Sequence, residues 1–193
     1  MPDLIRHPVP TWIPAFAGMT ILRYLIAGVI FTMSLNIMTH IREKAIEGLN
    51  VGDMFSVSRK FTENDMNLFA DITRDYNPVH FDERFTEVKG YDSRICHGLL
   101  VAGMITEIGG QMGCLATDMR FSFKKPVYFG DNIVCKLVIS EQDDNGWFNA
   151  KAEYKNQNGT IVIEALLKGI GPGFKEKEVM KAMIAEGDPT NKI

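Results

Sequence analysis

Residues 98–113 of the chain read GLLVAGMITEIGGQMG and are almost wholly apolar. Leu99, Leu100, Met104 and Ile108 leave a helix over this stretch without a polar face. A helix that is apolar all round has to be surrounded by protein. The stretch therefore predicts a long, buried central helix, and the rest of the chain has to supply the elements that cover it.

Segments with strand character follow this stretch. Asp144-Asn145-Gly146 and Asn158-Gly159 predict hairpin turns, because Asn and Gly accept positive φ at little cost. Strands joined by such turns form an antiparallel sheet, and one sheet with a buried helix belongs to the α+β class. We therefore expect the sheet to wrap the helix. The predicted strands are residues 118–123, 132–141, 147–154 and 160–170.

A short strand and a helix are predicted before the apolar stretch. Residues 57–61 alternate in polarity, which is typical of a strand. Thr62 and Asp65 then form a capping-box pattern, and apolar residues follow at helical spacing, so a helix is expected over residues 63–74. Pro78 cannot continue a helix, which makes residues 75–80 a loop at the helix end.

Composition excludes several classes of protein. The chain has 193 residues, 46% of them hydrophobic and 23% charged, and a net charge of -3. This is enough for one domain with a sizeable core, and it lacks the basic surface of a nucleic-acid-binding protein. Three cysteines without a C-x-x-C pattern suggest neither a disulfide framework nor a zinc site. We expect reduced thiols, a cytoplasmic location and no metal.

The first 40 residues differ in character from the rest. Residues 24–38 form an uncharged apolar run of 15 residues, short of the roughly 20 that span a bilayer. Three interpretations stay open: a gene start placed too early, a signal or membrane anchor, and a folded appendage. The early gene start is favoured over membrane association. We expect an N-terminal extension over residues 1–40, a domain over 41–171 and a tail over 172–193, in which 175–186 carry a weak helical pattern.

Asp75 and His80 lie five residues apart on the loop that contains Pro78. A carboxylate and an imidazole at this spacing can converge on one water molecule for general acid–base catalysis. Gly98 opens the apolar helix, where free amides could stabilise an oxyanion. The alternatives are a turn capped by Asp75 and Asn77, an ordinary loop histidine, and a glycine that permits close packing.

The same residues resemble the MaoC-like, (R)-specific enoyl-CoA hydratase family of the hot-dog fold, over about residues 49–170. That resemblance implies a sheet around a long central helix, an edge-to-edge homodimer and no cofactor. It also implies reversible syn addition of water to trans-2-enoyl-CoA, giving (R)-3-hydroxyacyl-CoA. The motifs that carry it are residues 61–75 followed by Asn77-Pro78-x-His80, then Ile95-Cys96-His97-Gly98, and residues 123–131.

The resemblance also implies roles for individual residues. Asp75 takes the proton of a catalytic water, and His80 helps to deliver a proton to C2. Asn77 fixes the loop, and the Gly98 amide donates to the thioester oxygen. His97 is a supporting residue.

Three further positions carry expectations of their own. Thr106 stands where many members of the family have a serine that supports the catalytic carboxylate, although its hydroxyl could instead bond to its own helix. Gly103 replaces a residue that is usually larger. Phe123 is expected in the core.

Two other functions stay open. A hot-dog thioesterase also polarises a thioester carbonyl at a helix start, although His80 favours hydration, in which a proton must reach carbon. A catalytically silent acyl-thioester binding domain is the third interpretation. The sequence leaves the carrier open between CoA and acyl carrier protein. Arg94, Lys124 and Lys125 are only candidates for a CoA phosphate site.

Overall fold

The computed structural model describes residues 40–188 and residue 190. The expectations for a signal, an anchor or an early start fall on residues 1–37 and lie outside the described residues. Within the described part, no helix combines the length and the apolar character needed to cross a membrane.

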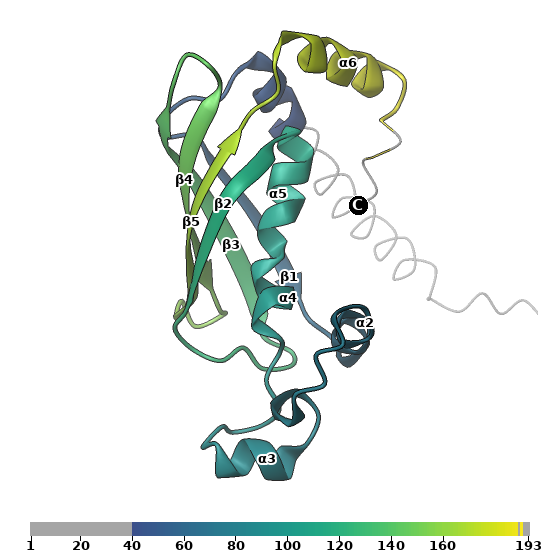
Figure 1. Ribbon diagram of the computed structural model, residues 1–193, viewed down its shortest axis with the longest axis vertical. Helices are drawn as coiled ribbons and strands as arrows, with labels where there is room; N and C mark the ends of the chain where they lie inside the picture. Colours follow the sequence, from purple (N-terminus) through teal and green to yellow (C-terminus); the bar gives the residue numbers. More distant parts are fainter. Residues whose placement is uncertain (1–39, 189, 191–193) are drawn as a thin grey trace, which may run out of the picture. The chain divides into compact units, whose positions relative to one another are not determined.

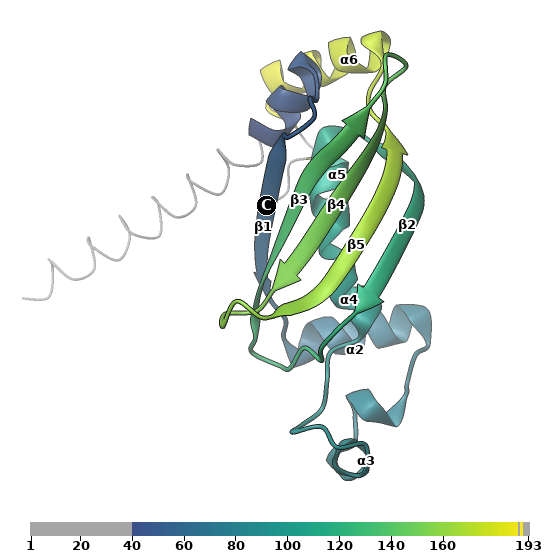
Figure 2. The same ribbon diagram turned by 90° about the vertical axis from the view of Figure 1, so that its left-hand side faces the viewer.

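A five-stranded antiparallel sheet forms one layer of the domain, with the strand order β1-β3-β4-β5-β2 (Figure 2). The prediction of an α+β fold is therefore confirmed. Gly146 and Gly159 have φ of 84° and 75°, as the two predicted hairpin turns require. The strands are β1 (Met54–Lys60), β2 (Leu115–Phe123), β3 (Asn132–Gln142), β4 (Trp147–Lys155) and β5 (Ile161–Ile170).

Alternating burial explains which face of the sheet forms the core. On β3 the buried side chains include Ile133, Cys135, Leu137 and Ile139, with more exposed residues between them. This period of two places the apolar set on one face. The last three strands match their predictions to within one residue at each end. β1 and β2 each begin three residues earlier than predicted.

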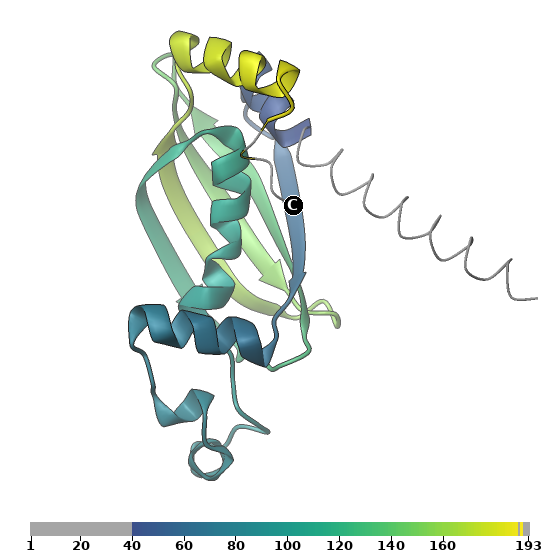
Figure 3. The ribbon, with the colours of Figure 1, turned by 90° about the vertical axis from the view of Figure 1, so that its right-hand side faces the viewer.

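The central helix lies across the concave face of the sheet as α4 (Gly98–Ala102) and α5 (Met104–Met112) (Figures 1 and 3). Ile108 and Met112 are almost completely buried. Leu99, however, is 63% exposed, so the prediction of a helix surrounded on all sides is wrong for a single chain. The five strands cover one side of the helix, and part of the opposite side stays open.

α2 (Glu63–Thr73) crosses the end of the domain near α4, with α3 (Glu83–Val88) beyond it (Figure 3). The capping box is present: the amide of Thr62 donates to Asp65 Oδ2 at 2.8 Å, and the amide of Asp65 donates to Thr62 Oγ1 at 3.3 Å. Arg74 ends α2 in the left-handed conformation with φ of 59°. α3 has only six residues and was not predicted from the sequence.

A helix over residues 40–47 and α6 (Phe174–Ala185) pack at the opposite end of the domain (Figure 1). Arg42 is buried and forms an ion pair with Asp188, and its Nε donates to the carbonyl of Gln111 at 3.3 Å. Met180 is the buried residue of α6. The weak helical pattern of the tail therefore marks a helix that is packed onto the domain.

Candidate active site

The loop after α2 is shaped by its own side chains. Asp75 Oδ1 accepts a hydrogen bond from the amide of Asn77 at 3.2 Å, and Asn77 Oδ1 accepts one from the amide of Val79 at 3.2 Å. Such turns give the backbone partners outside any helix or strand. Pro78 then opens a short 3-10 helix, η1 (Pro78–His80), and the loop holds the Asp75 and His80 side chains on the same side.

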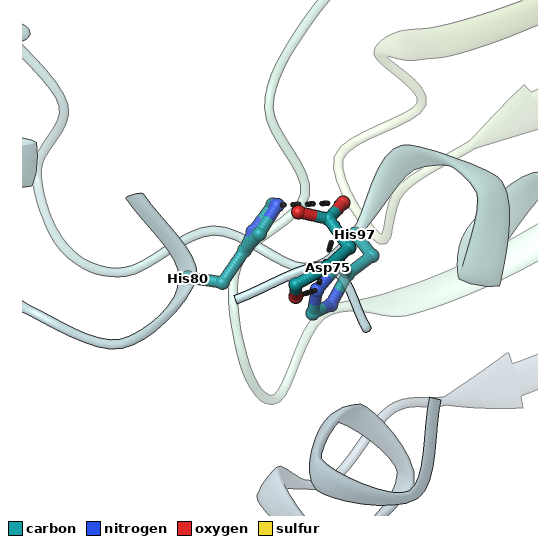
Figure 4. Close-up of side chains that lie close together, drawn as sticks. All are labelled: Asp75, His80 and His97. Atoms are coloured by element: carbon teal, nitrogen blue, oxygen red, sulfur yellow. Dashed lines mark hydrogen bonds and ion pairs between the residues drawn. The ribbon is translucent and has the colours of Figure 1, made fainter. Parts of the chain in front are cut away.

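His80 is anchored through one ring nitrogen and leaves the other available. Its Nδ1 lies 2.8 Å from the carbonyl oxygen of Ile95, and only 7% of the residue is exposed. A carbonyl can only accept, so Nδ1 carries the hydrogen and Nε2 has a lone pair in the neutral ring. That Nε2 lies 4.0 Å from Asp75 Oδ2 (Figure 4).

His97 joins the pair from the segment that precedes the central helix. Its Nε2 lies 2.8 Å from the backbone carbonyl oxygen of Asp75 and 3.9 Å from Asp75 Oδ2. Its ring stacks on His80, with centroids 3.7 Å apart and planes at 27°. His97 is 1% exposed, and its Nδ1 has no hydrogen-bond partner within the described residues. The contact fixes the backbone of Asp75 and the ring of His80 together.

Burial favours a neutral His80. It lowers the pKa of this imidazole, and the hydrogen bond to Ile95 opposes the shift without reversing it; His97 lowers the pKa further. The Asp75 side chain is half exposed and can meet water. At neutral pH the site therefore offers a carboxylate oxygen and an imidazole lone pair facing one another.

Gly98 shares a pocket with His80. The pocket has a volume of about 450 Å³. A Cβ on Gly98 would lie 2.8 Å from the Phe123 ring, so no larger residue fits without movement. As the first residue of α4, Gly98 has an amide with no acceptor inside the helix. The prediction that Phe123 belongs to the core is wrong for a single chain: it is 52% exposed, because its strand β2 is at the edge of the sheet. The part of its ring that is covered lies against Gly98.

Thr106 and the basic residues are placed elsewhere. The Thr106 hydroxyl donates to the Gly103 carbonyl at 2.7 Å, and the residue lines a separate apolar pocket between α5 and the sheet. Arg94 pairs with Glu63. Lys124 and Lys125 line the pocket of His80, with Lys124 2.8 Å from Glu164.

The histidines and Asp75 lie close enough together to be considered as metal ligands. Their nitrogens are poorly arranged for it. His80 Nδ1 and His97 Nε2 both point their hydrogens at carbonyl oxygens, and the two rings are stacked, so their lone pairs do not converge. The donors fit proton transfer better than metal ligation.

Asp75 Oδ2 and His80 Nε2 are too far apart, at 4.0 Å, for a direct hydrogen bond. One water between them can donate a hydrogen to each, which leaves a lone pair of its oxygen free to attack carbon. The Ile95 carbonyl that fixes the His80 ring could not be predicted, because a backbone group has no sequence signal. For His97, the only signal was its place directly before Gly98.

The chain is similar to proteins of known family. Residues 50–162 match the model of the MaoC like domain family. A mitochondrial 3-hydroxyacyl-[acyl-carrier-protein] dehydratase from Arabidopsis thaliana is 30% identical over 133 residues, which cover 65% of this chain and 80% of that protein. The (R)-specific enoyl-CoA hydratase of Aeromonas caviae is 26% identical over 129 residues, which cover 63% and 96%.

Solved structures agree with this result. An unliganded R-hydratase from Pseudomonas aeruginosa superposes with a TM-score of 0.61 at 25% identity, over 66% of this chain and 84% of that one. The (R)-hydratase from A. caviae gives the same TM-score and identity over 64% and 98%. The hot-dog fold implied by the sequence is therefore confirmed.

Proposed function

The chain belongs to the MaoC-like domain family, and on that premise we propose that it adds water reversibly to trans-2-enoyl thioesters and yields (R)-3-hydroxyacyl thioesters. The relatives named above are hydratases and dehydratases, which catalyse one reaction in its two directions. The chain is thus a hydro-lyase. One observation supports the finer proposal most: Asp75 Oδ2 and His80 Nε2 lie 4.0 Å apart, next to the pocket that contains Gly98.

In the proposed mechanism, Asp75 and His80 hold one water between them. As the oxygen of this water bonds to C3, Asp75 takes one of its protons. That proton passes to the free Nε2 of the neutral His80, and His80 delivers it to C2. The pair is unchanged after one turnover, because it gains one proton and returns one. Positioned acid–base groups of this kind contribute about 10²- to 10⁴-fold in rate.

The Gly98 amide has the complementary role. Attack at C3 moves negative charge onto the thioester oxygen before C2 is protonated. A backbone amide aimed at that oxygen stabilises the charge, and one such donor contributes about 10²- to 10³-fold. Asn77 and His97 position the reacting groups. Asn77 shapes the loop by accepting from the amide of Val79, and His97 contacts the Asp75 carbonyl and the His80 ring.

We take CoA as the carrier in this proposal. The A. caviae relative, of which this chain covers 96%, is named for enoyl-CoA, whereas the A. thaliana relative is named for acyl carrier protein. Both carriers present the same thioester to Asp75, His80 and Gly98, so the chemistry proposed for the site is independent of this choice.

The test is hydration of crotonyl-CoA, followed by loss of the enoyl-thioester absorbance, with chiral analysis of the product and a disulfide reagent to trap free thiol. We expect (R)-3-hydroxybutyryl-CoA and no thiol release. An S product would contradict the stereochemistry, and thiol release as fast as water addition would favour a thioesterase. Crotonyl-acyl carrier protein, assayed in parallel, identifies the preferred carrier.

We also propose that the protein is a homodimer. β2 is an edge strand, and eight of its nine residues are exposed in the burial pattern of a single chain. Leu115 and Met119 are 68% and 44% exposed on it. An uncovered apolar edge of this kind is a template for pairing with a second chain. Sedimentation at micromolar concentration should give a dimer, and a monomer would contradict the proposal.

A further inference from the structure

The central helix is divided at Gly103 by a change in its hydrogen bonding. The amide of Thr106 donates to the carbonyl of Gly103, three residues back, at 2.9 Å. A regular α-helix would direct it to Ala102, four residues back. The Thr106 hydroxyl donates to the same Gly103 carbonyl at 2.7 Å. This tightened turn leaves the carbonyl of Ala102, the last residue of α4, without its usual helical donor.

Tyr154 on β4 supplies the missing donor. Its hydroxyl lies 2.7 Å from the Ala102 carbonyl oxygen, and its side chain is completely buried. Burial raises the pKa of Tyr154 well above its usual value, so the hydroxyl keeps its proton and can donate. Without it, a buried carbonyl would have no donor, which destabilises the arrangement.

The position of Tyr154 in the sheet makes it a firm support. β4 is the middle strand of the sheet, and the neighbours of Tyr154 across it, Cys135 on β3 and Ile163 on β5, are both buried. Ala102 is only four residues from Gly98, roughly 6 Å along a helix. A contact that fixes the end of α4 therefore also fixes its beginning.

From these contacts we infer that Tyr154 is a positioning residue, which holds the junction of α4 and α5 and thereby sets the direction of the Gly98 amide at the pocket. The inference rests on the proposed function, because this direction matters to the rate only if a thioester oxygen lies against the amide. It assigns to the middle of the sheet a part in the reaction that no residue of the loop or pocket performs.

Loss of the hydroxyl has a definite structural consequence. The amide of Thr106 can then take the Ala102 carbonyl, and the tightened turn becomes an α-helical one. A turn of three residues winds about 120° per residue and an α-helix about 100°, so α4 rotates by roughly 20°. Misplacement of a catalytic group by about 1 Å can cost up to about 10²-fold in rate.

The test compares Tyr154→Phe with Phe148→Leu, a buried aromatic on the same strand that makes no hydrogen bond to α4. In Tyr154→Phe we expect kcat for crotonyl-CoA to fall about ten-fold, with KM within about two-fold, because only the transition state uses the amide. The amide NMR signal of Gly98 should shift. In Phe148→Leu the melting temperature should fall, while kcat stays within about two-fold and the Gly98 signal stays in place.

Equal kcat values for the two variants would overturn the inference and leave the hydratase proposal standing. If the wild type does not hydrate crotonyl-CoA, the proposed function fails, and the Gly98 signal alone decides: an unmoved signal in Tyr154→Phe overturns the positioning role. If Tyr154→Phe does not fold, Gly103→Ala perturbs the junction from the helix side, where a Cβ would lie 3.1 Å from the Leu100 carbonyl oxygen. In that variant, kcat for crotonyl-CoA and the amide NMR signal of Gly98 are measured in the same way.

Discussion

The two ends of the central helix are completed in different ways. At the carboxyl end the carbonyl of Gln111 receives a hydrogen bond from the buried Arg42, and Arg42 in turn pairs with Asp188. At the amino end the helix begins at Gly98 in a pocket that also contains His80. Every helix leaves unpaired backbone groups at both ends. Here a side chain of the protein satisfies one end, and on the proposed function the amide at the other end binds the thioester oxygen.

The difference separates stability from chemistry along one helix. Contacts at the carboxyl end join the helix over residues 40–47, α5 and the C-terminal segment, so they should affect folding. Contacts at the amino end involve a half-exposed carboxylate and a free amide, so they should affect rate. Substitutions at the carboxyl end should therefore change stability, and substitutions at the amino end should change the rate.

The largest effect is expected at the amino end, from Asp75→Asn and from His80→Ala. Each removes one of the two acceptors proposed to hold the water, so kcat for enoyl-CoA hydration should fall by about 10²- to 10⁴-fold. Asn at position 75 can still accept the hydrogen bond from the amide of Asn77, so the loop should remain formed. The melting temperature is the control. Full activity in either variant would contradict the expectation that contacts at the amino end of the helix determine the rate.

The next effect is expected at the carboxyl end, from Arg42→Ala. It leaves Asp188 without its cation and the Gln111 carbonyl without its side-chain donor, so unfolding should become easier by about 3 kcal/mol. Arg42→Lys, which retains the charge, should lose less. Denaturant titration measures the loss, and kcat per folded molecule should be unchanged. A fall in kcat at unchanged stability would contradict the assignment of stability to the carboxyl end and rate to the amino end.

A smaller effect is expected from Gly98→Ala. Its Cβ would meet the Phe123 ring at 2.8 Å, so the ring or the helix start has to move, and kcat/KM should fall by about ten-fold or more. Gly110→Ala on α5 is the matched control, because no atom lies within 4 Å of the added Cβ. That control should gain roughly 1 kcal/mol in stability from the better helix former. Equal kcat/KM in the two variants would contradict the proposed role of Gly98 in the reaction.

The smallest effect near neutral pH is expected from pH itself, because the lowered pKa of His80 leaves only a small fraction of this imidazole protonated there. Protonated His80 cannot accept from the water, so activity should fall with decreasing pH, with a midpoint below pH 6.5 because burial lowers its pKa. Stability should depend on pH in the same direction. The contribution of neutral His80 to the free energy of unfolding is complete above pH 6.5 and is lost as pH falls through the lowered pKa of His80. His40→Gln, an exposed position, should not move the midpoint of kcat/KM. A midpoint above pH 6.5 would show a cationic His80 at the site.

The sequence predicted the parts of the fold that depend on local rules. Residues 132–141 alternate with a period of two, and the structure has β3 there with one further residue. Thr62 and Asp65 form the expected capping box. These features could be predicted because turn chemistry and helix capping act within a few residues.

Other features depend on partners distant in sequence and could not be predicted. The junction at Gly103 is supported by Tyr154, which lies 52 residues from Ala102 in the chain. α3 is too short to show a helical period. Phe123 was expected in the core, yet its exposure depends on the edge position of its strand, which only the strand order reveals.

The candidate site divides in the same way. Asp75 and His80 could be proposed because they are five residues apart on a proline-containing loop. The stacking of His97 on His80 and the bond from His80 to the Ile95 carbonyl join segments 15 to 17 residues apart, and no spacing rule indicates them. They nevertheless decide that Nε2 is the His80 nitrogen left without a partner, and this is the nitrogen proposed to face the water.

The central claim is that Asp75 and His80 hold one oxygen opposite the Gly98 amide. A crystal structure of the Asp75→Asn variant with (R)-3-hydroxybutyryl-CoA tests it most directly. We expect the 3-hydroxyl oxygen within about 3 Å of both the residue 75 side chain and His80 Nε2, and the thioester oxygen within about 3 Å of the Gly98 amide. A hydroxyl bound away from His80, or a thioester oxygen remote from Gly98, would contradict it.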